Sequence, residues 1–96
     1  MEQFRPLSGF FEAIKSDGRI CISHIGLYAT LVQYWQEHHF VNPFQAFSYE
    51  VTGMAKISAN TYHKCIRDLH DFGYINYEPS FKRNQRSKVQ LLYLAE

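Results

Sequence analysis

A run of polar and basic side chains between Lys56 and Arg67 could recognise a negatively charged polymer. Its members are Lys56, Ser58, Asn60, Thr61, His63, Lys64 and Arg67, and no carboxylate interrupts them. Asparagine and arginine can form paired hydrogen bonds with base edges, whereas lysine and threonine suit phosphate groups. The solvated face of an ordinary amphipathic helix would have a similar composition. The side chains of this stretch alone therefore leave both interpretations open.

A second basic cluster lies near the C-terminal end of the sequence. It consists of Lys82, Arg83, Asn84, Gln85, Arg86 and Lys88, again without a carboxylate. Charged residues at the tip of a hairpin also keep sheet edges from associating, which is the structural alternative. Because this cluster has four basic side chains and no acidic one, we favour contact with the backbone or minor groove of a nucleic acid.

The elements that position the first group form a helix, a break and a second helix over residues 48–73. The first helix is predicted at Tyr49–Ala55 with Ser48 as its N-cap, and Lys56 and Ile57 fill the break. The second helix begins after the N-cap Ser58 and ends at Gly73. Its apolar residues recur at helical spacing, and they are Tyr62, Cys65, Ile66 and Leu69. This is the helix-turn-helix pattern, with the polar face of the second helix directed outward.

Two strands are predicted to follow and to enclose the second basic cluster. Residues 74–78 and 89–94 alternate and are rich in residues that favour strands. The 74–94 region is thus a hairpin with a basic loop.

The whole Ser48–Leu94 region resembles the winged helix-turn-helix family of DNA-binding domains. The resemblance rests on Ser58, Thr61 and Lys64 of the second helix. It also rests on the segment from Leu69 through Gly73 to Ile75, where this helix ends and the next strand begins. It implies sequence-specific binding of double-stranded DNA in transcription regulation, with the helix from Ser58 in the major groove, in a protein of the small stand-alone bacterial kind. Winged helices also serve as protein-interaction or replication-assembly modules, so that alternative stays open.

The remaining residues are expected to complete one domain over 1–96, mainly α with a small β-hairpin. A scaffold helix is predicted over 23–38, capped by Ser23, with an apolar face wide enough to contact elements on two sides. Leu7–Ser16 adds a helix within the N-terminal extension 1–22. Gln45–Phe47 is predicted to form the short strand that pairs with the wing in the winged-helix family.

Composition and charge predict a binding partner and a cellular location. The 96 residues have a net charge of +1, but residues 56–96 hold seven basic and four acidic side chains. The aromatic fraction of 17% exceeds what one small core needs, so we expect a homodimer through the N-terminal half, with Leu7–Ser16 and Tyr34–Phe44 at the interface. Two cysteines, no signal peptide and no apolar spanning run predict a cytoplasmic protein without membrane contact.

Catalysis and metal binding have little support in the sequence. Nucleophile, P-loop and dinucleotide motifs are absent, and the carboxylates are scattered. His63 and His70 are about two helical turns apart, which is too far to share an ion. We therefore expect no enzymatic activity, no cofactor, no metal and no small-molecule effector.

Overall fold

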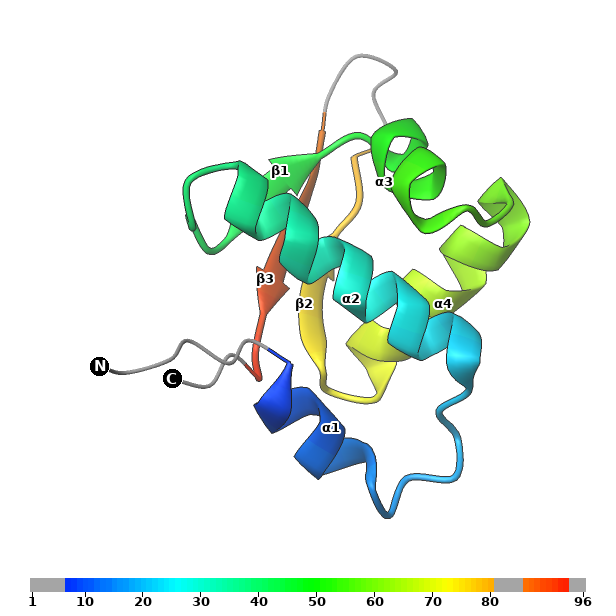
Figure 1. Ribbon diagram of the computed structural model, residues 1–96. Coiled ribbons are helices and arrows are strands. Elements are labelled where there is room, and N and C mark those ends of the chain that lie inside the picture. The colour runs from blue at the N-terminus through cyan, green and yellow to red at the C-terminus, as the bar shows by residue number, and fades with distance from the viewer. Residues whose placement is uncertain (1–6, 81–85, 94–96) are drawn as a thin grey trace.

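The structure is a computed structural model that describes residues 7–80 and 86–93. These residues form a compact α+β fold of four helices and a three-stranded antiparallel sheet. In chain order the elements are α1 (Ser8–Ile14), α2 (Ile22–Glu37), β1 (Phe44–Ala46), α3 (Ser48–Ala55), α4 (Ala59–Asp71), β2 (Ile75–Glu78) and β3 (Ser87–Leu91). Figure 1 shows α2 running across the sheet, with α3 and α4 beside it and α1 at one end.

β3 is the central strand of the sheet, although it comes last in the sequence. It pairs with β1 through Phe44 opposite Val89, and with β2 through Ile75 opposite Leu91. Side chains along β3 alternate between buried and more exposed, so Val89 and Leu91 face the helices while Lys88 faces outward. The strand therefore starts two residues earlier than predicted, and it ends at Leu91 rather than Leu94.

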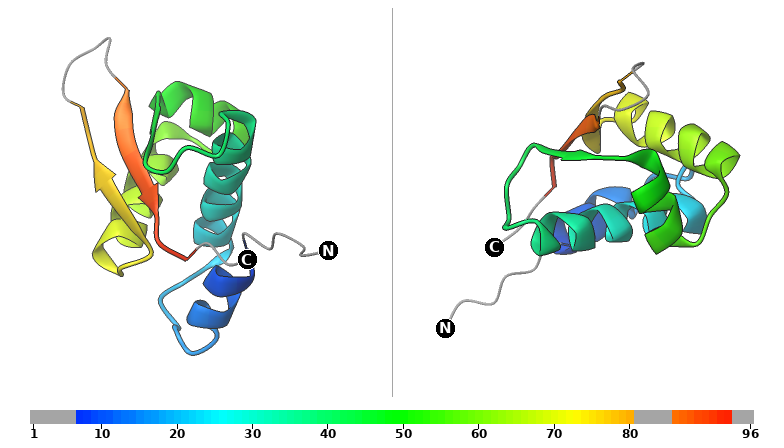
Figure 2. Two further views of the ribbon diagram at one scale, coloured as in Figure 1. Left: turned by 90° about the vertical axis from the view of Figure 1, so that its left-hand side faces the viewer. Right: turned by 90° about the horizontal axis from the view of Figure 1, so that it is seen from above.

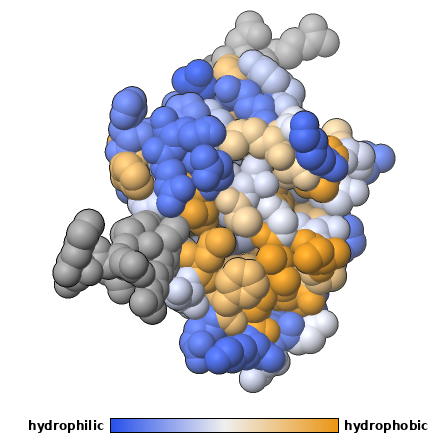
Figure 3. Space-filling model, in the orientation of Figure 1, coloured by the Kyte–Doolittle hydropathy of each residue, from blue (hydrophilic) through white to orange (hydrophobic). Residues whose placement is uncertain are grey.

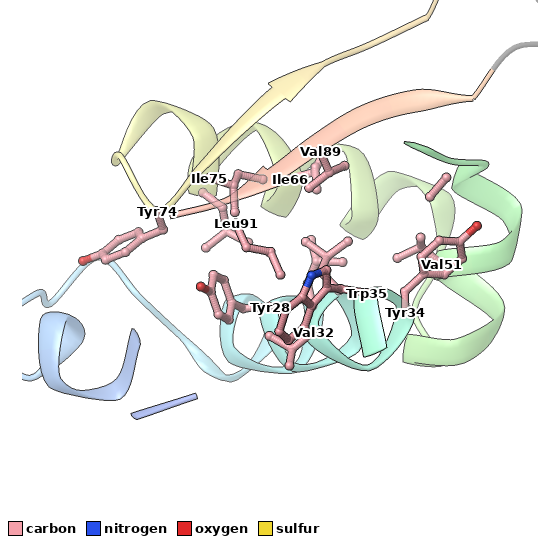
Figure 4. Close-up of a cluster of buried hydrophobic side chains, with 14 of the residues drawn as sticks. Tyr28, Val32, Tyr34, Trp35, Val51, Ile66, Tyr74, Ile75, Val89 and Leu91 are labelled. Atoms are coloured by element: carbon pink, nitrogen blue, oxygen red, sulfur yellow. The ribbon is translucent and has the colours of Figure 1, made fainter. Parts of the chain in front are cut away.

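The core lies between α2, α4 and the inner face of the sheet. Figure 4 shows Tyr28, Val32 and Trp35 of α2 directed toward Ile66 of α4 and toward the sheet residue Leu91. All five side chains are at most 4% exposed. Burying one such side chain contributes about 1.5–3 kcal/mol, so this layer holds the three elements at fixed positions.

α1 closes the end of this core through a single aromatic side chain. The ring of Phe10 is fully buried and stacks on Tyr28, with 3.9 Å between the ring centroids. Phe11, its neighbour on the same helix, is 44% exposed.

Two predicted helix caps are wrong. α2 begins at Ile22, with Cys21 and not Ser23 at the N-cap, and the side chain of His24 accepts from the Cys21 N–H. α3 begins at Ser48 itself, with Phe47 at the N-cap position and the Glu50 carboxylate accepting from the Phe47 N–H. In both cases the side chain at the third helical position accepts a hydrogen bond from the backbone N–H of the N-cap residue. The statistical preference for serine at the N-cap did not predict this arrangement.

The predicted limits of α4 are confirmed. The Ser58 hydroxyl accepts from the Thr61 N–H at 3.1 Å. At the other end Gly73 has a φ of +89°, and the N–H groups of Gly73 and Tyr74 donate to the carbonyls of His70 and Leu69. This Schellman arrangement needs a left-handed residue, which glycine supplies without steric strain. It turns the chain directly from α4 into β2.

Candidate nucleic-acid interface

The outward face of α4 is a stripe of polar side chains. Asn60, His63, Lys64 and Arg67 are all exposed, whereas Tyr62, Cys65, Ile66 and Leu69 are buried. Residues three and four apart share one face of a helix, so the exposed group forms one continuous strip along about two turns. The structure thus brings together four of the residues predicted from the sequence.

Ser58 and Thr61 are engaged in forming the start of the helix. The Ser58 hydroxyl donates to the Thr61 hydroxyl at 3.0 Å and accepts the Thr61 N–H. Lys56 lies just before them, exposed, in a left-handed conformation with φ of 60°. These three residues lie at the N-terminal end of the strip, and only Lys56 among them carries a positive charge.

Lys64 is held by an acidic neighbour on the same helix. Its ammonium group lies 3.0 Å from Asp68, which also contacts His24 of α2 at 2.9 Å. Hydrogen bonds from His24 and from Lys64 hold the pKa of the Asp68 carboxyl below its ordinary value. The sequence did not indicate the pairing of His24 with Asp68, because 44 residues separate them.

A shallow groove runs from α4 to the start of the hairpin. It has a volume of about 630 Å³ and is lined by His63, Ile66, Arg67, His70, Tyr77, Pro79 and Ser80. The Tyr77 N–H donates to the ring of His70 at 3.0 Å, which ties β2 to the last turn of α4. The lining combines the apolar Ile66 and Pro79 with the cationic Arg67, so it suits a sugar–phosphate strand passing between the helix and the hairpin.

The hairpin residues are only partly described. Lys82, Arg83, Asn84 and Gln85 lie outside the described residues. The guanidinium of Arg86 lies 5.0 Å from the centroid of the Phe47 ring, and Lys88 lies 4.0 Å from Glu78 on the neighbouring strand. Cross-strand pairing with Glu78 reduces the charge that Lys88 contributes to the outer face of the sheet.

Pairing divides the cations into two groups. The described part of the chain contains seven lysines and arginines, and four of them (Lys15, Arg19, Lys64 and Lys88) form ion pairs within it. The other three, within the same residues, form no ion pair, and they are Lys56, Arg67 and Arg86. All three belong to the predicted interface.

The helix and the hairpin share one side of the molecule. The view from above in Figure 2 shows α4 and the β2–β3 hairpin along one side, with α1 and α2 on the other. Figure 3 shows that hydrophobic side chains gather on this second side, where α1 meets the start of α2. Phe11 on α1 and Ile22 at the start of α2 are 44% and 79% exposed.

No three histidine, cysteine or acidic residues of ranges 7–80 and 86–93 come close enough together to hold a metal ion. None of the helices in those ranges has the length and apolar character needed to cross a membrane. Comparison with protein-family models, with curated proteins and with solved structures found no significant match to this chain.

Proposed function

We propose that this chain is a winged helix-turn-helix protein that binds double-stranded DNA in a sequence-specific manner and regulates transcription. α3 and α4 are the helix-turn-helix, and β2 and β3 are the wing. α4 enters the major groove, and the basic loop between β2 and β3 contacts the backbone or the minor groove. β1, paired with β3, completes the sheet.

The observation that carries this proposal is the exposed strip on α4, which ends at Arg67, a residue that forms no ion pair within 7–80 and 86–93. A major groove is about 12 Å wide and admits one α-helix. The strip presents an amide, an imidazole and a guanidinium in successive turns, and these groups can donate to base edges. Asn60 and Arg67 are therefore assigned to base contact, and Lys56 and Arg86 to phosphate contact.

The alternative, a protein-interaction or replication-assembly module, would need an exposed apolar surface on α4. Tyr62 is 1% exposed, and Phe72 packs partly buried against the core. The exposed apolar side chains at α1 and the start of α2 instead suit a contact between two copies of the chain. A homodimer would place two α4 helices on one duplex and add the affinities of two half-sites.

The test is a salt-titrated binding measurement with random duplex DNA, followed by selection of a preferred sequence. Arg67→Ala and Lys15→Ala each remove one positive charge, but Lys15 lies at the C-terminal end of α1 and pairs with Glu12. We expect Arg67→Ala to weaken binding and Lys15→Ala to leave it nearly unchanged. Equal effects of the two variants, or no duplex binding at low salt, would contradict the proposal.

A further inference from the structure

His70 continues the exposed strip of α4 by one further turn. His63, Arg67 and His70 lie on one face of the helix, are all exposed, and line the groove between α4 and the start of the hairpin. From Asn60 to His70 an α-helix rises about 15 Å. A major groove is about 12 Å wide. A helix whose N-terminal part contacts the bases therefore brings its His70 end to the phosphate backbone.

The hydrogen bond to β2 defines where the proton of the His70 ring lies. The backbone N–H of Tyr77 donates to Nδ1 of His70 at 3.0 Å. Because a backbone N–H can only donate, Nδ1 is an acceptor and the ring proton is on Nε2. Within residues 7–80 and 86–93 this Nε2 forms no hydrogen bond. His70 therefore has one N–H donor that remains available to a ligand.

The donor is held in place by the sheet. Tyr77 pairs with Val89 of the central strand β3, and its side chain packs partly buried against the core. The ring of His70 is thus tied to the backbone of a paired strand at one end and to α4 at the other. A side chain that is fixed in advance loses little conformational freedom when it contacts a ligand.

The charges around His70 indicate on which side an anion would bind. His70 lines the groove and also a smaller pocket of about 220 Å³ on the sheet, where Glu78 and Lys88 oppose each other. Among the described residues that line the groove, Arg67 is cationic and none is a carboxylate. Asp71, the next residue of α4, is exposed but does not line the groove. The groove is therefore the side that favours a phosphate group.

We propose that His70 is a further DNA-contacting residue, whose Nε2–H donates to one phosphate of the strand that lies in the groove. The inference rests on the proposed function, and it adds a contact that limits how far α4 enters the major groove. The donor is a neutral imidazole, so it binds a phosphate oxygen without neutralising its charge. Such a contact adds affinity without the counterion release that makes binding by Lys56 or Arg86 depend on salt.

The first experiment determines the tautomer of His70 without DNA. Protein with isotope-labelled histidines is studied by long-range proton–nitrogen correlation at pH 8. We expect the ring of His70 to carry its proton on Nε2, with Nδ1 unprotonated. A dominant tautomer with the proton on Nδ1 would overturn the inference, whether or not the chain binds DNA.

The second experiment separates the two nitrogen atoms of His70 by substitution. Asparagine can present an oxygen near the position of Nδ1, whereas glutamine can present an N–H near the position of Nε2. We expect His70→Asn to lower duplex affinity about tenfold and His70→Gln to stay within about threefold of wild type. The salt dependence should be unchanged in both variants. Equal losses in the two variants, or a flatter salt dependence, would overturn the assignment of a neutral donor.

Asn76→Ala is the control for these variants. Asn76 is an exposed polar residue of β2 that donates to Gln90 and does not line the groove. Its replacement should leave duplex affinity unchanged. A loss equal to that of His70→Asn would show that any polar change near the start of β2 disturbs binding, and it would overturn the inference.

The third experiment identifies the phosphate. In a duplex of the selected sequence, one backbone position at a time carries a neutral methylphosphonate. At one position this change should weaken wild type about tenfold but affect His70→Asn little, because both changes remove the same contact. Additive effects at every position, or a His70→Asn variant that binds as tightly as wild type, would overturn the inference and leave DNA binding intact. A wild type that binds no duplex would instead refute the proposed function, and the inference with it.

Discussion

Replacing Asp68 by alanine removes the carboxylate that connects α4 to α2. The variant leaves the Nε2–H of His24 without its acceptor, and the His24 side chain is only 3% exposed, so water has little access to replace it. A hydrogen bond to a charged group contributes about 1.5–3 kcal/mol. Loss of the exposed contact to Lys64 adds no more than about 0.5 kcal/mol. We expect the free energy of unfolding to fall by about 2 kcal/mol.

Thermal and urea unfolding, followed by circular dichroism, measure this effect. In a domain of this size each kcal/mol lowers the melting temperature by about 4–8 °C, so the expected decrease is about 8–16 °C. Asp71→Ala is the matched control, because Asp71 lies exposed on the same helix and forms no ion pair within residues 7–80 and 86–93. The free energy of unfolding of this control should stay within about 0.5 kcal/mol of the wild-type value. Equal melting temperatures for the two variants would show that the contact between His24 and Asp68 contributes nothing to stability, which would refute the prediction.

The same link predicts a pH dependence. The pKa of Asp68 is lowered in the folded state from an ordinary value of 3.8, so the unfolded chain binds the proton more readily. The stabilisation is therefore present above that value and is lost as the pH falls through the lower, folded-state pKa. The difference in free energy of unfolding between wild type and Asp68→Ala, measured by urea unfolding, should persist at pH 5 and decrease below about pH 3.8.

Three further predictions concern binding and assembly. Asn60→Ala and Arg67→Ala should weaken binding to the preferred duplex far more than to random DNA, since a good bidentate base contact provides about 1–3 kcal/mol of discrimination; equal losses in competition assays would reassign both residues to phosphate contact. Changing both Arg83 and Arg86 to alanine should lower affinity for all duplexes and flatten the salt dependence by up to about two units; an unchanged slope would remove the wing from the interface. Sedimentation at tens of micromolar should show a dimer that Phe11→Ser with Ile22→Ser converts to a monomer; a monomeric wild type, free and DNA-bound, would exclude the expected dimer.

The sequence predicted α4 well because three local signals agree there. Ser58 caps the helix, the apolar residues recur on one face, and Gly73 permits the left-handed turn at its end. Each signal acts within a few residues, so no knowledge of tertiary contacts was needed. The exposed strip of Asn60, His63, Lys64 and Arg67 follows directly from the same periodicity.

The sequence could not predict contacts that depend on distant residues. His24 was expected only to open the scaffold helix, but it is buried against Asp68, and Cys21 takes the N-cap because His24 can accept its N–H. Lys64 and Lys88 were counted as available cations, yet Asp68 and Glu78 are close enough to pair with them. The pair of Lys64 with Asp68 follows from i, i+4 spacing on one helix, whereas the contacts of Lys88 with Glu78 and of His24 with Asp68 depend on how strands and helices pack.

The most direct test of the central claim is to map the DNA-binding surface by chemical shifts. Isotope-labelled protein is titrated with a duplex carrying its selected sequence, and changes are recorded for backbone and side-chain amides. The proposed function predicts the largest changes at Asn60, His63 and Arg67 on α4, with smaller ones at Arg86. Changes confined to α1 and the exposed side of α2, with α4 unaffected, would contradict it.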